Sequence, residues 1–330
     1  MKKLFLFTVM TLAANLCLGS AFAETSTSET TRVLTRESVI EKYRTSEDQY
    51  VTLDGIEIHY RAEGSGPAVL LLHGTLGDLM DWDVWADSLK DRYRVIRFDL
   101  PGFGTSADMP NANYSVDRMH TTIDSLMDHL GEEQFALVGI SYGGMVAFRY
   151  AATRVARVSS LILLNSAGIQ TGKAPPKAKG DSKAQARKNF FTHPIVEYSD
   201  IEGFYDAYIN DPKARSPEFI GRKLDFLNIV GREVSGHQAR NLYEVGDPIR
   251  VLSHVQAPAL VMWGEGNAAL DTQTAHTFVT AMKNSCLVDL VTFEGGGHYI
   301  NVGRPQESVE PAARFLDRLR AGNTFLTCPK

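Results

Sequence analysis

Residues 135–150 read FALVGISYGGMVAFRY, and this stretch decides the fold. An apolar run leads into the motif Gly139-x-Ser141-x-Gly143, and a second apolar stretch that suits a helix follows it. A strand–turn–helix bend of this kind pushes its serine hydroxyl above the sheet, and the flanking glycines allow the close chain approach that the bend requires. The pattern predicts a nucleophilic Ser141 at a helix N-terminus, whose free N–H groups favour a developing negative charge. The alternative is a Gly-rich turn with an incidental serine.

Other short apolar runs lie on both sides of this motif. Together with it they cover residues 68–74, 94–100, 135–141, 160–168, 259–266 and 287–296. Apolar strands that alternate with helical stretches are typical of a parallel sheet covered by helices on both faces. An alternating stretch over 50–64 turns at Asp54-Gly55 and predicts a hairpin ahead of the first run. The expected fold class is α/β with a mostly parallel sheet.

Helix signals separate these runs. Ser115 can cap a helix that Gly131 ends, and residues 36–44 suit a short helix. A last helix is expected within 305–322. Its core-facing side chains would be Val309, Ala313, Leu316 and Leu319.

Residues 169–250 break the alternation, because they contain no clear buried strand. Helical candidates within them cover 201–210, 217–230 and 236–246. We predict an inserted helical cap over the carboxyl-terminal edge of the sheet. The expected organisation is a core of residues 50–168 and 251–320, a cap of residues 169–250 and a tail of residues 321–330.

The N-terminus has the pattern of a secretory signal. Lys2 and Lys3 precede an apolar run, and AFA at residues 21–23 matches a small-x-small cleavage site. Cleavage would remove residues 1–23 and leave a polar segment over 24–49, with no stable membrane span after cleavage. The alternatives are an uncleaved anchor and a lipoprotein signal at Cys17. We expect the protein to be periplasmic or secreted.

Composition and cysteine content are consistent with an exported globular protein. Of 330 residues 44% are hydrophobic, and the formal charge of −5 argues against a broad nucleic-acid surface. Signal cleavage would leave Cys286 and Cys328, which an oxidising compartment favours as a disulfide. Such a bridge is worth about 4 kcal/mol in the chain-entropy estimate. Two unpaired thiols are the alternative.

Two loops after strands supply the other groups that an activated serine needs. In LLLHGTLGD (70–78) the backbone N–H of Thr75, or next to it Leu76, is a candidate oxyanion donor, and the residue after the serine, Tyr142, supplies the second. In FEGGGHYINVGRP (293–305) His298 is the candidate base that takes the serine proton. His73 suits a structural role in its loop. No metal-ligand spacing and no nucleotide motif occurs, so no cofactor and no metal is expected.

Five motifs, in this order, resemble the α/β-hydrolase superfamily, in its serine-nucleophile branch with a helical cap. They are HGTLGD (73–78), RFDLPGFGTS (97–106), GISYGG (139–144), WGEGN (263–267) and GGGHYINVGRP (295–305), and the resemblance covers roughly residues 50–320. Relatives that use an aspartate nucleophile, such as epoxide hydrolases, carry Asp where this chain has Ser141. The resemblance therefore implies hydrolysis of an ester, lactone, amide or carbon–carbon bond through a serine. Asp99 and Ser106 are interpreted as a pair that holds a turn.

The resemblance also implies an acid four residues after Trp263, and that position holds Asn267. An amide can accept a hydrogen bond from His298 but cannot supply negative charge. Asp271 is the leading charged candidate, although it also suits a helix N-cap. Glu265 is a further candidate. The resemblance implies one more possible position for the acid, at the end of the expected strand SLILLN (160–165), and it holds Asn165, which is also an amide.

These residues predict an exported serine hydrolase, in first place a carboxylesterase or lactonase on a small-molecule ester, lactone or amide. Ser141 would be the nucleophile, His298 the base, and Asp271 or Asn267 its orienting partner. The alternatives are a ligand-binding protein of the same fold with weak or no turnover, an iminopeptidase-like enzyme, and a carbon–carbon bond hydrolase.

Overall fold

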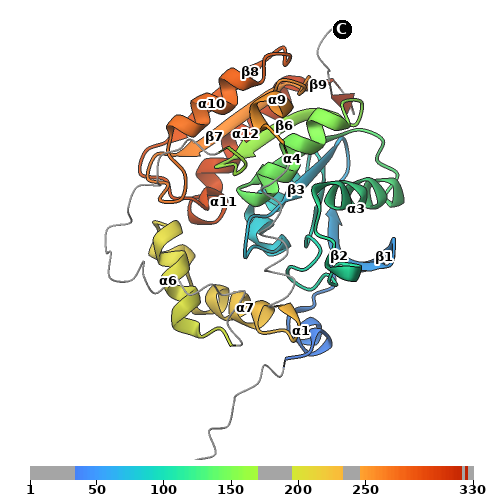
Figure 1. The fold of residues 1–330 in the computed structure, drawn as a ribbon, viewed down its shortest axis with the longest axis vertical. Coiled ribbons are helices and arrows are strands. Elements are labelled where there is room, and N and C mark those ends of the chain that lie inside the picture. Colours follow the sequence, from blue (N-terminus) through green and yellow to red (C-terminus); the bar gives the residue numbers. More distant parts are fainter. Residues whose placement is uncertain (1–33, 170–194, 233–245, 322–323, 326–330) are drawn as a thin grey trace, which may run out of the picture. The chain divides into compact units, whose positions relative to one another are not determined.

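The computed structural model describes residues 34–169, 195–232, 246–321 and 324–325. All of them belong to one compact unit, Thr31–Lys330. Its centre is an eight-stranded sheet in the order β1-β2-β4-β3-β5-β6-β7-β8 (Figure 1). The strands are β1 (Gln49–Leu53), β2 (Ile56–Glu63), β3 (Ala68–Leu72), β4 (Arg94–Phe98), β5 (Phe135–Ile140), β6 (Val158–Leu164), β7 (Ala259–Gly264) and β8 (Val288–Phe293).

The expected fold class is confirmed. The strands β1 and β2 form the predicted hairpin, β2 pairs antiparallel with β4, and every other neighbouring pair in this sheet is parallel. All residues of β3, β5, β6 and β7 are buried, because helices cover both faces of these central strands. Their continuous apolar runs are the sequence signal of that double coverage.

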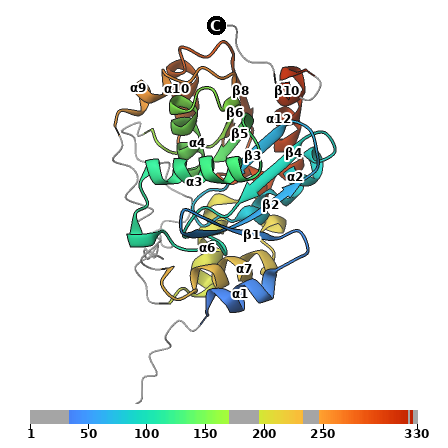
Figure 2. The same cartoon turned by 90° about the vertical axis from the view of Figure 1, so that its right-hand side faces the viewer.

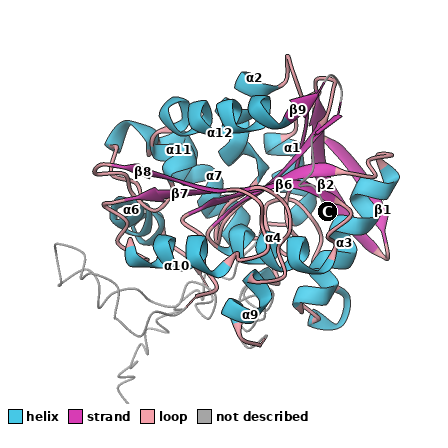
Figure 3. Ribbon diagram, turned by 90° about the horizontal axis from the view of Figure 1, so that it is seen from above, coloured by secondary structure: helices cyan, strands magenta, loops and turns pink. Residues whose placement is uncertain are grey.

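Two layers of helices enclose the sheet, as the view in Figure 3 shows. One face is covered by α3 (Val116–His129), α4 (Tyr142–Thr153), α9 (Pro248–Leu252) and α10 (Gln273–Ala281). The other is covered by α2 (Asp83–Leu89), α11 (Ile300–Gly303) and α12 (Pro305–Leu319). Two hydrophobic clusters, one on each side of the sheet, result from this arrangement.

The helix signals read from the sequence locate the ends of α3. The Ser115 hydroxyl accepts a hydrogen bond from the N–H of Arg118, and Gly131 follows the helix with φ +76°. In α12 the predicted Val309, Leu316 and Leu319 are buried, and Ala313 packs half-buried against the same cluster. Ala312 and Phe315 are buried as well.

The inserted segment between β6 and β7 is helical where it is described. It contains α6 (Tyr198–Tyr208), η3 (Pro212–Ala214) and α7 (Pro217–Leu227), whereas the predicted helix over 236–246 lies outside the described residues. The two helices α6 and α7 lie together beyond one end of the sheet (Figure 1). The N-terminal helix α1 (Arg36–Tyr43) runs beside α7 (Figure 2), where Val39 packs against Phe226 and Ile229.

Buried charges attach this segment to the core. Lys223 of α7 is 1% exposed, and its Nζ lies 2.7 Å from Asp78 and 2.5 Å from Asp81. Arg222 contacts the same two carboxylates. Asp78 is the N-cap of η1 (Leu79–Trp82), and Asp81 lies inside it. The nearby cations hold the pKa of Asp78 well below its usual range despite its burial.

The remaining short elements are η2 (Pro110–Ala112) and the two-stranded pair β9 (Arg320–Ala321) and β10 (Thr324–Phe325). Cys286 is disulfide-bonded, and Cys328 lies outside the described residues, so their pairing stays a prediction. The predicted signal over 1–23 also lies outside them. Among the helices that the structure describes, none has the length and apolar character needed to cross a membrane.

Candidate active site

The candidate residues meet at the carboxyl ends of the parallel strands. Ser141 follows β5, Asn267 lies in the loop after β7, His298 lies in the loop after β8, and Thr75 lies in the loop after β3. Parallel strands bring such loops to one edge of the sheet, where α/β proteins bind their ligands. The contact between Ser141 and His298 thereby joins residues 157 positions apart.

Ser141 occupies a tight bend between β5 and α4. Its φ is +52°, a left-handed value that is costly for a residue other than glycine. A Cβ on Gly139 would lie 2.4 Å from the carbonyl oxygen of Gly143, and a Cβ on Gly143 would lie 2.5 Å from that of His73. Both positions need glycine because the chain passes itself so closely. The predicted role of these glycines in the bend is confirmed.

Ser141, His298 and Asn267 form a hydrogen-bonded row. Ser141 Oγ lies 2.8 Å from His298 Nε2, and His298 Nδ1 lies 3.1 Å from Asn267 Oδ1. All three side chains are at most 7% exposed. A histidine that donates from Nδ1 keeps Nε2 free to accept the serine proton. This geometry suits the predicted roles of a nucleophile, a general base and an orienting group, which stay predictions.

Of the two candidate partners of His298, the structure brings Asn267 to the ring and not Asp271. Asp271 directly precedes the N-cap of α10, Thr272, and its carboxylate accepts the N–H of Gln273 at 2.9 Å. Its contact is therefore with the helix start and not with the ring. Glu265 is exposed and also does not bond to the ring. Among the described residues no carboxylate contacts His298.

Burial without a charged partner changes the basicity of His298. The ring is 4% exposed, and removal from water lowers its pKa from 6.5 to about 3. No opposing negative charge raises the pKa. The ring is therefore neutral, and able to accept a proton, throughout the ordinary pH range.

A tight turn lies beside the serine and carries the candidate oxyanion donor. The N–H of Gly77 donates to the carbonyl of Gly74, and Leu76 has φ +60°. A Cβ on Gly74 would lie 3.2 Å from the Cβ of Ser141, so the turn runs next to the nucleophile. Thr75 follows Gly74 in this turn, and Tyr142 follows Ser141 at the start of α4. Their roles as oxyanion donors stay a prediction.

His73 stabilises this turn by hydrogen bonds, as the sequence predicted. Its Nε2 accepts the N–H of Leu100 at 3.0 Å, and its Nδ1 lies 2.8 Å from the carbonyl of Gly74. Since Nε2 accepts, Nδ1 carries the proton and donates to that carbonyl. Burial lowers the pKa of His73, in accordance with a neutral structural ring.

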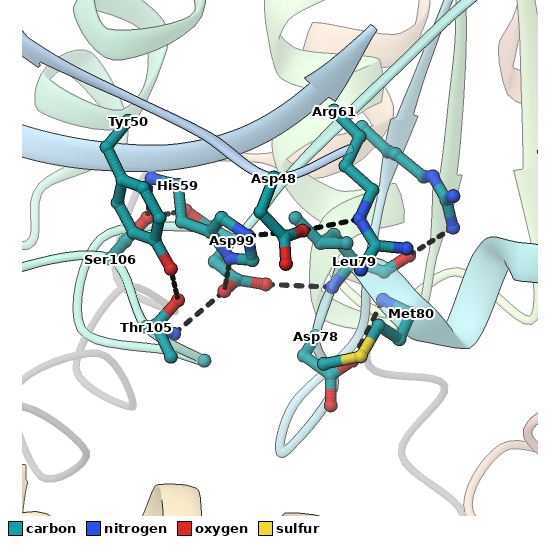
Figure 4. Close-up of polar contacts among 12 residues, drawn as sticks. Asp48, Tyr50, His59, Arg61, Asp78, Leu79, Met80, Asp99, Thr105 and Ser106 are labelled. Atoms are coloured by element: carbon teal, nitrogen blue, oxygen red, sulfur yellow. Dashed lines mark hydrogen bonds and ion pairs between the residues drawn. The ribbon is translucent and has the colours of Figure 1, made fainter. Parts of the chain in front are cut away.

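Asp99 fixes the neighbouring loop, and Figure 4 shows its contacts. Its carboxylate accepts the N–H groups of Leu79 and Thr105, each at 2.8 Å, and Ser106 Oγ donates to its carbonyl oxygen at 2.6 Å. The predicted turn-holding role of Asp99 and Ser106 is confirmed. In addition, the Asp99 carboxylate lies 2.7 Å from Nδ1 of His59, which the sequence did not suggest.

Three tyrosines contact the site through hydrogen bonds that the sequence did not predict. Tyr299 donates its hydroxyl to the carbonyl of Thr75 at 2.6 Å, and Tyr205 of α6 donates to that of Leu76 at 2.8 Å. The backbone carbonyl of Tyr208 accepts the N–H of His298 at 2.8 Å. The aromatic content of residues 201–210 was the only available signal. In the described part of the chain, no cluster of His, Cys, Asp and Glu could hold a metal ion.

A family model described as the alpha/beta hydrolase fold matches residues 67–305. The chain belongs to this α/β-hydrolase family. The resemblance inferred from the five motifs is thereby confirmed, and the matched region contains the serine, the amide and the histidine described above.

Named relatives in the α/β-hydrolase family differ in chemistry. The chain is 28% identical over 306 residues to 2-hydroxy-6-oxononadienedioate/2-hydroxy-6-oxononatrienedioate hydrolase of Burkholderia vietnamiensis. This alignment covers 88% of this chain and 100% of that protein. It is 36% identical over 273 residues to epoxide hydrolase 4 of Homo sapiens, covering 76% of this chain and 73% of that one. The solved structure of a bacterial membrane phospholipase A superposes with a TM-score of 0.68 and 26% identity, over 86% of this chain and 92% of that one.

Proposed function

We propose that this protein is an exported serine hydrolase that cleaves carboxylic esters or lactones. The observation that carries the proposal is the 2.8 Å contact between Ser141 Oγ and His298 Nε2 in a buried site. A hydroxyl is a weak nucleophile until a neighbouring base takes its proton. The left-handed conformation of Ser141 supports the same role, because strained residues persist where a site requires them.

The proposed reaction has two halves. Ser141 Oγ attacks the ester carbonyl carbon, and its proton passes to Nε2 of His298. The N–H groups of Thr75 and Tyr142 bind the oxygen that becomes negative. The intermediate collapses, His298 returns the proton to the leaving alcohol, and an acyl group remains on Ser141. Water, deprotonated by the same ring, then releases the acid and regenerates the serine.

Asn267 has a limited part in this chemistry. Its carbonyl oxygen, 3.1 Å from Nδ1, keeps the ring in the tautomer that presents Nε2 to the serine. It supplies no charge to stabilise the imidazolium that forms. We therefore expect lower turnover than an equivalent site with a carboxylate.

The ester and lactone assignment rests on the nucleophile and on one relative. Epoxide hydrolases of this family use an aspartate nucleophile, and this chain has Ser141 at that position. We therefore do not extend the likeness to epoxide hydrolase 4 to epoxide opening. The similarity to a phospholipase A supports carboxylic ester cleavage. We further propose that the inserted segment caps the site and selects the substrate, since α6 contacts both the turn at Leu76 and the loop of His298.

A carbon–carbon bond hydrolase is a second candidate, favoured by the full-length similarity to the oxononadienedioate hydrolase. A ligand-binding protein with weak turnover is a third, favoured by the absence of a carboxylate on His298 among the described residues. Both candidates use the same residues, so they differ from the leading proposal in substrate and rate.

The test is a panel of aryl esters, lactones, amides and vinylogous 1,5-diketones assayed with the purified protein. The predicted result is ester or lactone turnover. Ser141→Ala abolishes it, and Ser88→Ala, on the exposed side of α2, leaves it intact. Turnover of the diketones alone would favour the second candidate. Binding of several panel members with no turnover would favour the third.

Export is proposed from the N-terminal signal pattern and gains support from the disulfide at Cys286, since disulfides persist in oxidising compartments. Fractionation of a bacterial host that expresses the full chain tests it. Processing after Ala23 with the protein in the periplasm or medium is expected, and an unprocessed chain in the cytoplasm would contradict it.

A further inference from the structure

Asn165 lies behind His298 and has no part in the reaction proposed above. It follows β6, is fully buried and has φ +42°. Its Nδ2 donates to the backbone carbonyls of Gly297 at 3.2 Å and His298 at 2.7 Å. The side chain therefore holds the main chain of the histidine loop from the neighbouring strand.

The other end of the Asn165 amide meets two donors. Its Oδ1 accepts the backbone N–H of Gly264 and the Nδ2 group of Asn267, both at 3.0 Å. A flipped Asn165 would set its NH₂ against these donors and its oxygen against the two carbonyls. The hydrogen-bond pattern thus fixes one orientation of the amide.

The orientation of Asn267 is fixed in the same way. Its Oδ1 accepts the N–H groups of Ala269 at 2.9 Å and Leu270 at 3.1 Å, and its Nδ2 points to Asn165. The same oxygen also faces Nδ1 of His298, so Nδ1 must carry the proton and donate in that contact. The two amides and the ring therefore form one chain with a single consistent set of proton positions.

We propose that Asn165 is a positioning residue for His298, which acts through Asn267 and keeps the partner of the histidine a neutral amide. This inference rests on the proposed serine hydrolase function. It explains why amides occupy both positions at which the family resemblance implies an acid. An oxygen at residue 165 faces residue 267, so residue 267 must present a donor to it.

An aspartate at position 267 would not restore an ordinary acid. One of its oxygens would replace Nδ2, about 3.0 Å from the Asn165 oxygen, and two acceptors would then face each other in a buried site. The carboxyl group avoids this by staying protonated and donating to Asn165. A protonated carboxyl group is neutral, as the amide is, and adds no charge beside the ring.

A double-mutant cycle tests the proposal with Asn267→Asp, Asn165→Ser and the combined variant. Serine at 165 is small enough for its hydroxyl, or a water beside it, to donate to residue 267. Two readouts are used: kcat and KM on an aryl ester across pH, and the ¹³C-histidine NMR titration of His298, assigned with His298→Gln. Asn301→Ser removes a buried amide that bonds to the carbonyl of Asp81 and serves as the matched control.

Three results are expected. Asn165→Ser lowers kcat by roughly 10- to 100-fold with KM changed less than about twofold, because the ring is misplaced while the substrate pocket is not. Asn267→Asp alone leaves the ring titration within about half a pH unit of the parent. The combined variant raises the midpoint of the ring titration by about one pH unit or more, since an ionised carboxylate then faces the ring. Asn301→Ser changes neither readout.

An equal upward shift of the ring titration in Asn267→Asp and in the combined variant would overturn the proposal, and so would a parent-like kcat in Asn165→Ser. If Asn165→Ser does not fold, the titration of Asn267→Asp decides alone. The NMR arm needs no turnover. A parent protein that hydrolyses nothing would contradict the proposed function, while the titrations would still test the amide pair.

Discussion

At the scale of single residues, His298 combines deep burial with an uncharged partner. Its Nδ1 faces the carbonyl oxygen of Asn267, and burial lowers its pKa to about 3. A carboxylate partner would have raised the pKa, because it stabilises the protonated ring. The neutral partner therefore makes a base that is hard to protonate before substrate binds.

This predicts an unusual acid tolerance of the reaction. A ring with a pKa near 3 stays neutral as the pH falls through 6.5, whereas an ordinary histidine would be protonated there and lose its activity as a base. We expect kcat/KM for a neutral aryl ester to stay level down to about pH 5 and to fall only below it. A steady-state pH profile measures this, with circular dichroism to confirm folding at each pH. Half-maximal kcat/KM near pH 6.5 would contradict the prediction.

Asn267 and Asp271 lie in one loop, but we predict opposite effects on kcat when each is replaced by alanine. Asn267→Ala removes the orienting oxygen, and kcat should fall by roughly 10²- to 10⁴-fold. Asp271→Ala removes a hydrogen bond at the start of α10, so it should cost about 1 kcal/mol of unfolding free energy and leave kcat unchanged. Ester kinetics and urea unfolding of both variants separate the roles. A larger loss of kcat in Asp271→Ala than in Asn267→Ala would reverse the assignment.

Ser141 and His298 could be placed from sequence because each lies in a motif with strong local constraints. The partner of His298 could not be placed from sequence. A negatively charged partner favoured Asp271, and local sequence does not show which side chain of a loop turns inward. Asn267 turns inward since the N–H groups of Ala269 and Leu270 bind its oxygen. The role of Asn165 depends on contacts between three separate loops and has no local signal.

At the scale of elements, α6 and the histidine loop support the turn that carries Thr75. Tyr299 and Tyr205 bind the carbonyls of Thr75 and Leu76. Leu76 has a left-handed φ of +60°, so the turn needs outside support to keep its shape. The inserted segment is thereby coupled to the candidate oxyanion site.

The two hydroxyl groups should matter for rate. Tyr205→Phe or Tyr299→Phe leaves a carbonyl of the turn without its donor, and we expect kcat to fall about tenfold with KM nearly unchanged. Tyr198→Phe, on the exposed start of α6, is the matched control and should behave as the parent. Steady-state kinetics on an aryl ester provide the comparison. Parent-like kcat in both core variants would remove the proposed support.

Most of the strands and helices could be predicted from the sequence. Continuous apolar runs identified the central strands because these are covered on both faces, and capping residues located α3. The contact between α1 and α7 was not predicted, because residues 24–49 are polar in composition. Val39 is the one fully buried apolar side chain that α1 contributes, and Tyr43 adds a ring contact with Phe226 and a hydrogen bond to Asp225. The ion pairs of Lys223 with Asp78 and Asp81 join segments 145 and 142 residues apart and likewise lack a local signal.

At the scale of the whole molecule, a buried charged cluster joins the hairpin to the loop after β4. His59 of β2 lies between Asp99 at 2.7 Å and Asp48 at 2.9 Å, and Arg61 pairs with Asp48 (Figure 4). The ring of Tyr50 stacks on His59 at 4.7 Å. The two carboxylates outweigh burial and raise the pKa of His59 to about 9.

This cluster predicts how stability depends on pH. The pKa of His59 is about 9 in the folded protein and near 6.5 in the unfolded chain, so its contribution is fully present below pH 6.5 and is lost as the pH rises to 9. The slope approaches about 1.4 kcal/mol per pH unit at most. Urea unfolding at pH 6.5, 7.5, 8.5 and 9.5 should show a steeper loss in the parent than in His59→Gln. Parallel slopes would contradict the prediction.

The most direct measurement of the central claim is covalent labelling with a fluorophosphonate, followed by mass spectrometry of the digested protein. An activated serine is predicted to carry the adduct at Ser141, with labelling lost in Ser141→Ala and slowed in His298→Ala. Because His298 stays neutral in acid, labelling should persist at pH 5. A folded parent protein that takes no label at Ser141, or labels equally well without His298, would contradict the account.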